Sequence, residues 1–273
     1  DHHMKITHVM RGSEFLSSTP KHKLLYEAFG WDVPTYVHLP LILSPDGGKL
    51  SKRKGAAYFE DFVEEGFLPK ALINFLALLG FAPPDNREIF TLDELIEIFN
   101  IEGLSKSPST FDMQKLKWMN GEYIKNMPLD EFCEMAAPYT KNAAAAVMAQ
   151  GRISTLGEIA EMLDFVDNLP DYDIELFANK KNKSTAETSK DMLIKLLPEI
   201  ETFCAEQWQT ESLSAFLKDF AQKQDVKPAI VMWPVRTALS GKETSPGGAT
   251  DLLVVLGKDE SIARIKTALQ KLG

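Results

Sequence analysis

The stretch Gly47-Gly-Lys-Leu-Ser-Lys-Arg-Lys-Gly55 lies where the sequence changes from strand-like to helical patterns. Its cations on a glycine-flanked loop suit a polyphosphate, because glycine lets backbone N–H groups approach closely and ammonium groups offset the negative charge. The stretch is not a P-loop, since Leu50 follows Lys49 where that motif needs Ser or Thr, and Leu43 stands at its first glycine position. On composition alone, a solvated basic loop is the alternative interpretation.

Strand and helix patterns precede this loop. The apolar runs Ile6–Met10 and Tyr36–Leu43 predict two strands, and Pro20–Phe29 predicts a helix that Gly30 ends. Residues 1–45 are therefore interpreted as the tail of an α/β unit.

Helical patterns dominate after the loop, which predicts a mainly α chain. Apolar residues recur with helical spacing over residues 69–79, and Gly80 ends that helix. Thr91 with Glu94, and Thr155 with Glu158, form two predicted capping boxes. Further helices are predicted over residues 111–120, 129–137, 141–150, 156–166, 186–206 with a break near Pro198, 210–223 and 259–270. Boundaries are predicted near residues 45 and 125–128, with a weaker one at 179–185.

Composition excludes several classes of protein. At 273 residues the chain is expected to form two or three domains, and no apolar run reaches the roughly 20 residues of a membrane span. Cys133 and Cys204 lie in helix-like apolar patterns and are interpreted as buried free thiols, which indicates a reducing, cytoplasmic location. None of the five histidines has zinc-binding spacing, so neither zinc nor any other metal site is predicted.

The charge is unevenly distributed. The formal net charge is −9, but residues 1–60 hold eight Lys and Arg against six Asp and Glu, and the remainder carries −11. A global acidic balance argues against indiscriminate nucleic-acid binding, so neither DNA nor a membrane is an expected partner. A local basic surface remains compatible with these numbers.

Five motifs resemble the bacterial-type glutamyl-tRNA synthetases, which are class I aminoacyl-tRNA synthetases. Lys49-Leu-Ser-Lys-Arg53 resembles the Lys-Met-Ser-Lys-Ser loop of that class, and Asp1–Pro20 resembles the family's Asp-His-x-Met-x-Ile-Thr-His-Val-x-Arg-Gly-x-Glu-Trp-Leu-Ser-Ser-Thr-Pro stretch. The remaining matches are Phe111–Ile124, Trp233–Gly241 with Ser245-Pro-Gly247, and Leu256-Gly-Lys258. The resemblance runs from end to end and is weakest between about 130 and 230.

The resemblance implies three parts. Residues 1–45 would be a remnant of a Rossmann-type α/β catalytic domain, and residues 46–127 the lysine loop with a helical stem-contact domain. Residues 128–273 would be a helical anticodon-binding domain in two subdomains, split near 179–185. No histidine has the His-x-Gly-His context that class I catalysis requires. The chain is therefore expected to be a C-terminal fragment that binds tRNA without catalysing a reaction alone.

The resemblance also assigns residues to a catalytic site. Lys52 would contact the ATP phosphates and stabilise the charge that develops as pyrophosphate leaves. Arg11 would pair with the carboxylates of the amino acid, a role that suits a bidentate guanidinium. The other residues implied for the ATP site are Lys49, Ser51, Arg53, Glu14 and Phe15, with Phe15 standing where the family often has Trp.

In the C-terminal half, the resemblance places Arg236 and the Ser245-Pro246 turn against the anticodon. Arg152 resembles an arginine with which some bacterial members read the last anticodon base, although a helix-capping surface arginine is the alternative. Trp118 and Trp233 are interpreted as core residues.

The implied parent enzyme forms glutamyl-adenylate from glutamate and ATP with Mg²⁺ and then transfers the glutamyl group to tRNA-Glu. A glutaminyl-tRNA synthetase is the nearest alternative, but its anticodon domain is a β-barrel. A glutamyl-transferring tRNA-modifying paralogue is disfavoured because it lacks an anticodon domain. A non-catalytic RNA-binding module is the alternative outside the enzymes. Whether tRNA-Gln is also charged is left open.

Overall fold

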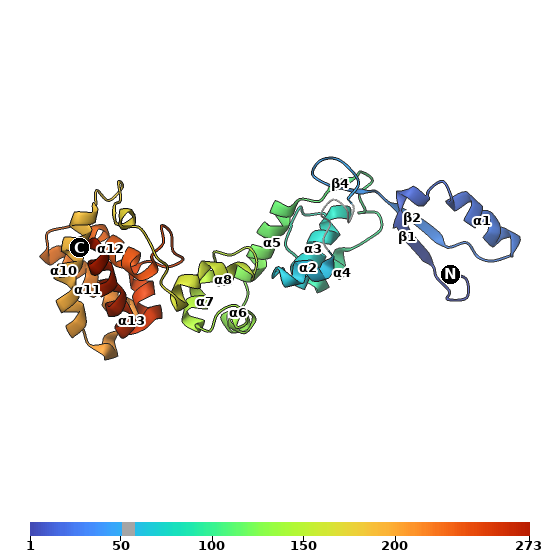
Figure 1. The fold of residues 1–273 in the computed structure, drawn as a ribbon. Coiled ribbons are helices and arrows are strands. Elements are labelled where there is room, and N and C mark those ends of the chain that lie inside the picture. Colours follow the sequence, from blue (N-terminus) through green and yellow to red (C-terminus); the bar gives the residue numbers. More distant parts are fainter. Residues whose placement is uncertain (51–57) are drawn as a thin grey trace. The chain divides into compact units, whose positions relative to one another are not determined.

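The chain forms two short parallel sheets, β1 with β2 and β3 with β4, and its other elements are helices (Figure 1). The structure, a computed structural model, describes residues 1–50 and 58–273. The chain divides into two compact units, which are unit 1 (Asp1–Tyr123) and unit 2 (Ile124–Gly273). The mainly α prediction is confirmed. The finer divisions at residue 45 and at 179–185 stay predictions.

Unit 1 begins with a β–α–β arrangement. Strands β1 (His8–Gly12) and β2 (Thr35–Leu39) pair in parallel, with His8 opposite Thr35, and helix α1 (Thr19–Ala28) connects them. Gly30 follows α1 in the left-handed region at φ 66°, which glycine adopts readily. The predicted strand 36–43 is interrupted at Pro40, because proline cannot donate a hydrogen bond to a ladder. Its second part, β3 (Ile42–Leu43), pairs instead with β4 (Ser109–Thr110).

The core of unit 1 lies among three helices. These are α2 (Phe59–Glu64), α3 (Pro69–Gly80) and α5 (Met113–Lys125), and α5 continues into unit 2. Their buried cluster consists of Phe62, Phe67, Leu72, Phe75, Leu79, Leu116 and Met119. Trp118 is 46% exposed on α5, which corrects its interpretation as a core residue. Its neighbours Met119 and Asn120 occupy the buried face of the helix instead.

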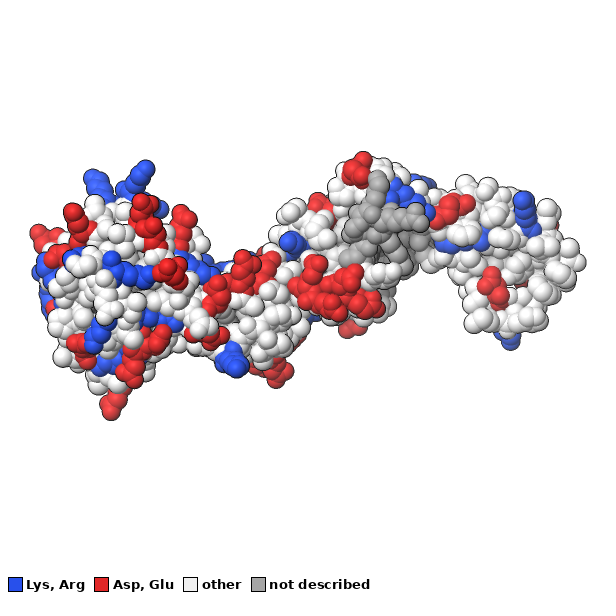
Figure 2. Space-filling model, in the orientation of Figure 1, with Lys and Arg blue, Asp and Glu red and all other residues white. Residues whose placement is uncertain are grey.

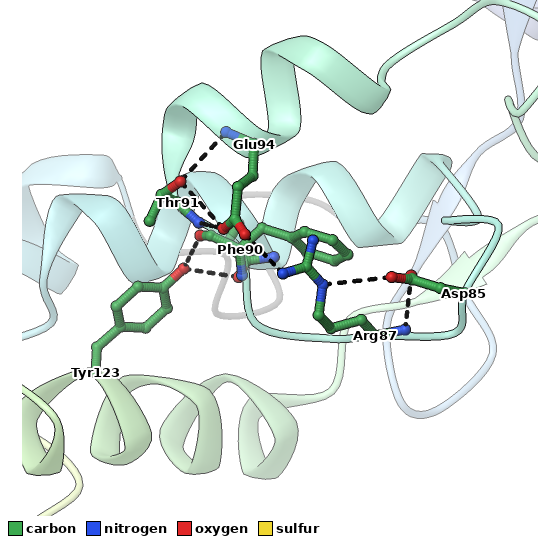
Figure 3. A network of polar contacts seen from close by, with 7 residues as sticks. Asp85, Arg87, Phe90, Thr91, Glu94 and Tyr123 are labelled. Atoms are coloured by element: carbon green, nitrogen blue, oxygen red, sulfur yellow. Dashed lines mark hydrogen bonds and ion pairs between the residues drawn. The ribbon is translucent and has the colours of Figure 1, made fainter.

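A polar network joins α3, α4 (Leu92–Ile98) and α5 (Figure 3). The buried Asn74 accepts hydrogen bonds from the Phe90 backbone N–H at 2.9 Å and from the Tyr123 hydroxyl at 2.7 Å. Thr91 and Glu94 form the predicted capping box at the start of α4, which is confirmed. Because buried polar groups need partners, the two hydrogen bonds that Asn74 accepts tie α3 to α5 and to Phe90, which precedes the capping box of α4, while Asn74 Nδ2 has no partner among the described residues.

Unit 2 contains two groups of helices. The first comprises α6 (Leu129–Ala136), α7 (Ala143–Ala149), α8 (Glu158–Met162) and α9 (Asp164–Asp167). The second comprises α10 (Ala186–Thr202), α11 (Thr210–Lys223), α12 (Pro228–Ser240) and α13 (Ala249–Leu272). Helix α12 packs against α10, α11 and α13, and its buried residues include Val231, Val235, Ala238 and Leu239.

Several predicted elements of unit 2 need correction. The predicted helix 156–166 is two short helices, and the capping box of Thr155 is wrong, since Gly157 precedes α8 and Glu158 accepts a hydrogen bond from the Ser154 backbone N–H at 2.9 Å. Helix α10 continues through Pro198 instead of breaking there. Cys204 lies in the turn after α10 and is exposed, so it is not a buried thiol.

Candidate functional site

Arg11 forms the centre of a cluster in unit 1. Its Nη2 donates a hydrogen bond to Thr19 Oγ1 at 2.7 Å and lies 3.3 Å from His22 Nδ1. The guanidinium carbon lies 5.1 Å from the ring centroid of Phe15 and 4.9 Å from that of Tyr36. Its buried Nε has no hydrogen-bond partner among the described residues. A planar guanidinium held close to two aromatic rings is suited to a carboxylate, which it can bind through two parallel N–H donors.

A cavity of about 300 Å³ lies beside this guanidinium. It is lined by Asp1, Arg11, His22, Leu25, Tyr26, Phe29, Trp31 and Tyr36. Aromatic side chains therefore form much of the wall around a single arginine. This arrangement can hold a small organic anion.

Glu14 and Lys49 connect this cluster to the glycine-flanked loop. Lys49 Nζ lies 3.2 Å from Glu14 Oε1. A hydrogen bond from its own backbone N–H and a second from Lys49 lower the pKa of the Glu14 carboxyl. The carboxylate folds over Gly12, where an added Cβ would lie 2.0 Å from Glu14 Oε2 and would displace it. The other loop residues predicted for the ATP site, Ser51, Lys52 and Arg53, lie outside the described residues.

A second cavity, of about 550 Å³, lies in unit 2. Helix α8 and the segment between α12 and α13 supply most of its wall. Its lining residues are Arg152, Glu158, Glu161, Met162, Lys242, Thr244, Ser245 and Pro246. Both signs of charge are therefore present around this cavity, together with the apolar Met162 and Pro246.

Arg236 supports one wall of this cavity from α12. Its Nη1 donates a hydrogen bond to Ser245 Oγ at 3.2 Å, and its Nη2 donates one to the Glu243 carbonyl oxygen at 2.9 Å. The guanidinium carbon lies 4.4 Å from the ring centroid of Trp233, whose indole N–H donates to the Leu176 carbonyl oxygen at 3.1 Å. Burial lowers the pKa of Arg236 from its ordinary value. Arg236 thus orients the 243–245 segment.

The residues predicted from sequence fall into two groups. Arg152, Ser245 and Pro246 line the cavity in unit 2, and Arg236 contacts Ser245 without lining it. Arg11 and Phe15 are in contact in unit 1, where Glu14 pairs with Lys49. Other cavity residues, namely Glu158, Glu161, Met162, Lys242 and Thr244, were not predicted as site residues. For Lys242 a signal was present, since it directly follows the Trp233–Gly241 motif.

Neither a clustered metal site nor a membrane-spanning helix is found among the described residues. Within residues 1–50 and 58–273, no group of three or more His, Cys, Asp or Glu side chains is arranged to hold a metal ion. Among the helices of the same residues, none has both the length and the apolarity needed to cross a membrane.

Family models match two regions of the chain. The model described as "tRNA synthetases class I (E and Q), catalytic domain" matches residues 1–118, and the model described as "Anticodon binding domain" matches residues 131–269. The first contains the Arg11 cluster and the second contains the cavity in unit 2.

Curated relatives match over the whole chain. A glutamate–tRNA ligase of Clostridium kluyveri is 47% identical over 100% of this chain and 57% of its own length. One from Clostridium novyi is 48% identical over 100% of this chain and 58% of its own length. The chain thus spans somewhat more than half the length of these relatives.

Solved structures agree with these matches. A crystal structure of a glutamate tRNA ligase from Elizabethkingia meningosepticum, in complex with its amino acid, has a TM-score of 0.87 and 31% identity, covering 100% of this chain and 59% of that one. The glutamate–tRNA synthetase of Elizabethkingia anophelis has a TM-score of 0.83 and 30% identity, covering 99% of this chain and 58% of that one.

Proposed function

Because this chain belongs to the family of class I tRNA synthetases that includes the glutamate–tRNA ligases, we propose that unit 2 binds the anticodon of tRNA-Glu. We propose further that unit 1 supplies part of a site in which glutamate is activated with ATP. The observation that carries the proposal is the cavity where Arg152, Ser245 and Pro246 meet, with Arg236 holding its wall.

The cavity has the chemistry that an unpaired base requires. Anticodon bases can turn outward, and proteins then read their edges with side-chain and backbone hydrogen bonds. Arg152 offers donors, and Ser245, whose hydroxyl donates to the Gly247 carbonyl oxygen at 2.7 Å, offers an acceptor oxygen beside the apolar ring of Pro246. Acidic and basic side chains are interspersed over the face of unit 2 that Figure 2 shows, so that face presents no broad basic area. The helices of unit 2 favour the glutamate enzyme over the glutamine enzyme, for which a β-barrel is expected.

In unit 1, Arg11 would bind a carboxylate of glutamate. Lys49, Ser51, Lys52 and Arg53 would bind the ATP phosphates, and Lys52 would stabilise the charge of the departing pyrophosphate. Electrostatic stabilisation of this kind is commonly the largest contribution to such a reaction. Glu14 and Phe15 would border the ATP, with Phe15 presenting a ring that is 46% exposed. Mg²⁺ would enter as part of the ATP complex.

Equilibrium binding tests the anticodon assignment. The chain and its Arg236→Ala variant are titrated with tRNA-Glu and with the same tRNA carrying a substituted anticodon, at two salt concentrations. The chain should prefer tRNA-Glu, and Arg236→Ala should reduce this preference by about 1–3 kcal/mol, because the 243–245 segment loses two hydrogen bonds.

Lys181→Ala serves as the matched control. Lys181 is exposed and lies outside the cavity, so its removal should leave the preference unchanged. Equal affinity of the unsubstituted chain for both tRNAs would contradict the proposal that unit 2 reads the anticodon.

A further inference from the structure

Lys242 spans the cavity in unit 2. It follows Gly241, which ends α12 in the left-handed region at φ 61° and so turns the chain sharply. Its Nζ donates a hydrogen bond to the Glu161 carbonyl oxygen at 3.1 Å, pairs with the Asp164 carboxylate, and lies 5.8 Å from the Phe165 ring centroid. All three partners belong to the α8–α9 region. Lys242 therefore links the segment after α12 to the opposite wall.

Arg264 makes the same connection from inside the fold. Its side chain is 3% exposed, and its Nη1 donates hydrogen bonds to the carbonyl oxygens of Phe165 and Leu239, both at 2.7 Å. Its Nη2 donates to the Val166 carbonyl oxygen at 3.0 Å, and its Nε pairs with Glu260 at 2.6 Å. Phe165 and Val166 lie in α9, whereas Leu239 lies in the last turn of α12. The guanidinium thus joins the two supports of the cavity.

Lys242 and Arg264 both connect the two walls of the cavity, so both affect the distance between these walls. Helix α8 carries Glu161 and Met162 on one wall, and the segment from Lys242 to Pro246 forms the other. Hydrogen bonds to a base edge weaken steeply when their geometry departs from the optimum, so binding groups must be held within about 0.5 Å. A change in the separation of the walls would therefore affect base discrimination before it affected general attraction to RNA.

We propose that Lys242 and Arg264 are positioning residues that set the separation of the two cavity walls, and that Lys242 does not bind an RNA phosphate. The proposal rests on the proposed function of unit 2. Its basis is that the Lys242 ammonium is already paired with Asp164 and bonded to the Glu161 carbonyl oxygen. The nearby cavity residues Glu158 and Glu161 also disfavour a phosphate. Arg264 is too deeply buried to reach RNA.

The test compares Lys242→Met with the unsubstituted chain. Affinities for tRNA-Glu and for the anticodon-substituted tRNA are measured over a series of salt concentrations. Discrimination should fall about 10-fold, the scale of one good base-edge contact, while the slope of log affinity against log salt stays unchanged. If Lys242 binds a phosphate, the slope should instead become shallower by about 0.7–0.9, with discrimination retained, and this would overturn the proposal. No change in either quantity would overturn it as well.

Further variants control for folding and for charge. Lys242→Arg should preserve discrimination, because a guanidinium can still bond to Asp164 and to the Glu161 carbonyl oxygen. Lys181→Met removes an exposed lysine outside the cavity and should leave discrimination unchanged. Arg264→Met should lower both the melting temperature and the discrimination. Lys242, whose side chain is 27% exposed, keeps the proposal testable if that variant does not fold.

Two different binding results separate the function of unit 2 from the role of Lys242. Equal affinity of the unsubstituted chain for both tRNAs would overturn the function of unit 2 and this inference together. A chain that discriminates, with a Lys242→Met variant that discriminates equally well, would overturn only the inference.

Discussion

Tyr172 is a buried aromatic residue whose hydroxyl group has no hydrogen-bond partner among the described residues. The centroid of its ring lies 4.8 Å from Lys271 Nζ. The ring centroids of Tyr172 and Phe177 lie 6.0 Å apart. Burial raises the pKa of Tyr172 to about 12, while the charge of Arg264 opposes the rise and that of Asp171 adds to it. The fold therefore favours the neutral hydroxyl without bonding to it.

We predict that Tyr172→Phe is as stable as the unsubstituted chain at pH 7, or more stable, because the variant no longer buries an unsatisfied hydroxyl group. The unsubstituted chain should lose stability as the pH rises from the ordinary tyrosine pKa of about 10 toward 12, since only the unfolded state then ionises Tyr172. The loss should approach about 1.4 kcal/mol per pH unit in that window, and the variant should lack this contribution.

Urea unfolding at pH 7, 10 and 11 measures the difference in unfolding free energy between the two proteins. A difference that does not change with pH would show that Tyr172 is already ionised in the fold at pH 11.

Only some of the residues that form the cavity in unit 2 could be predicted from the sequence. Resemblance selected Arg152, Ser245 and Pro246, and these three line one cavity. Lys242 directly follows the Trp233–Gly241 motif, but the motif does not indicate what Lys242 contacts, and Arg264 lies in no motif at all, because the partners of both are distant in the sequence. The Glu161 carbonyl oxygen is 81 residues from Lys242, and that of Phe165 is 99 residues from Arg264. In sequence alone, both resemble ordinary surface cations.

At the scale of elements, the amphipathic helix α3 was predictable and the buried helix α12 was not. Apolar residues recur with helical spacing over residues 69–80, and this segment forms α3 as expected. Helix α12 escaped prediction because its residues are apolar on almost every side and two prolines, Pro228 and Pro234, suggest breaks. Pro228 instead occupies the first turn, where its missing N–H has no partner to lose. Helix α13 begins at Ala249, ten residues before the predicted start, with a kink at Gly257 between.

That kink gives a prediction for Gly257→Ala. Gly257 has φ 76° and ψ 172°, a backbone region that is almost exclusive to glycine, although an added Cβ would meet nothing within 4 Å. Alanine should therefore destabilise the chain through backbone strain alone, by about 1–3 kcal/mol.

Gly151→Ala is the matched control within unit 2, because its added Cβ also meets nothing within 4 Å and its φ is not positive. Chemical denaturation should show the smaller effect for this variant. Equal unfolding free energies for the two variants would contradict a strained conformation at Gly257.

At the scale of the whole molecule, the family was predictable from short motifs because they carry the chemistry. Lys49-Leu-Ser-Lys-Arg53 and the stretch around Arg11 suffice to indicate the class, although net charge alone argues against a nucleic-acid partner. The −11 carried by the residues after 60 conceals the local site, since arginines such as Arg152 and Arg236 are few among many carboxylates. Composition averages over surfaces that binding does not use.

We predict that the 273-residue chain binds tRNA-Glu but does not catalyse ATP–pyrophosphate exchange. The physical reason is that the chain contains no His-x-Gly-His motif, so one of the two phosphate-binding motifs that class I catalysis is expected to need is missing. Exchange is measured with glutamate and tRNA present, with the Clostridium kluyveri glutamate–tRNA ligase as the longer comparison enzyme. Exchange by the chain clearly above a blank without enzyme would contradict the prediction.

The difference in burial between the β–α–β segment of unit 1 and helix α12 predicts a difference in how readily each segment opens. Strands β1 and β2 and helix α1 contain no buried side chain, whereas seven of the residues of α12 are buried. Local opening free energies follow the number of buried apolar contacts that must be broken. In this 273-residue chain, opening the β–α–β segment is therefore expected to cost less free energy than exposing α12 to solvent. Backbone amide hydrogens of the β–α–β segment should therefore exchange with solvent faster than those of α12. A ligand of Arg11 would bind to the segment that opens more readily.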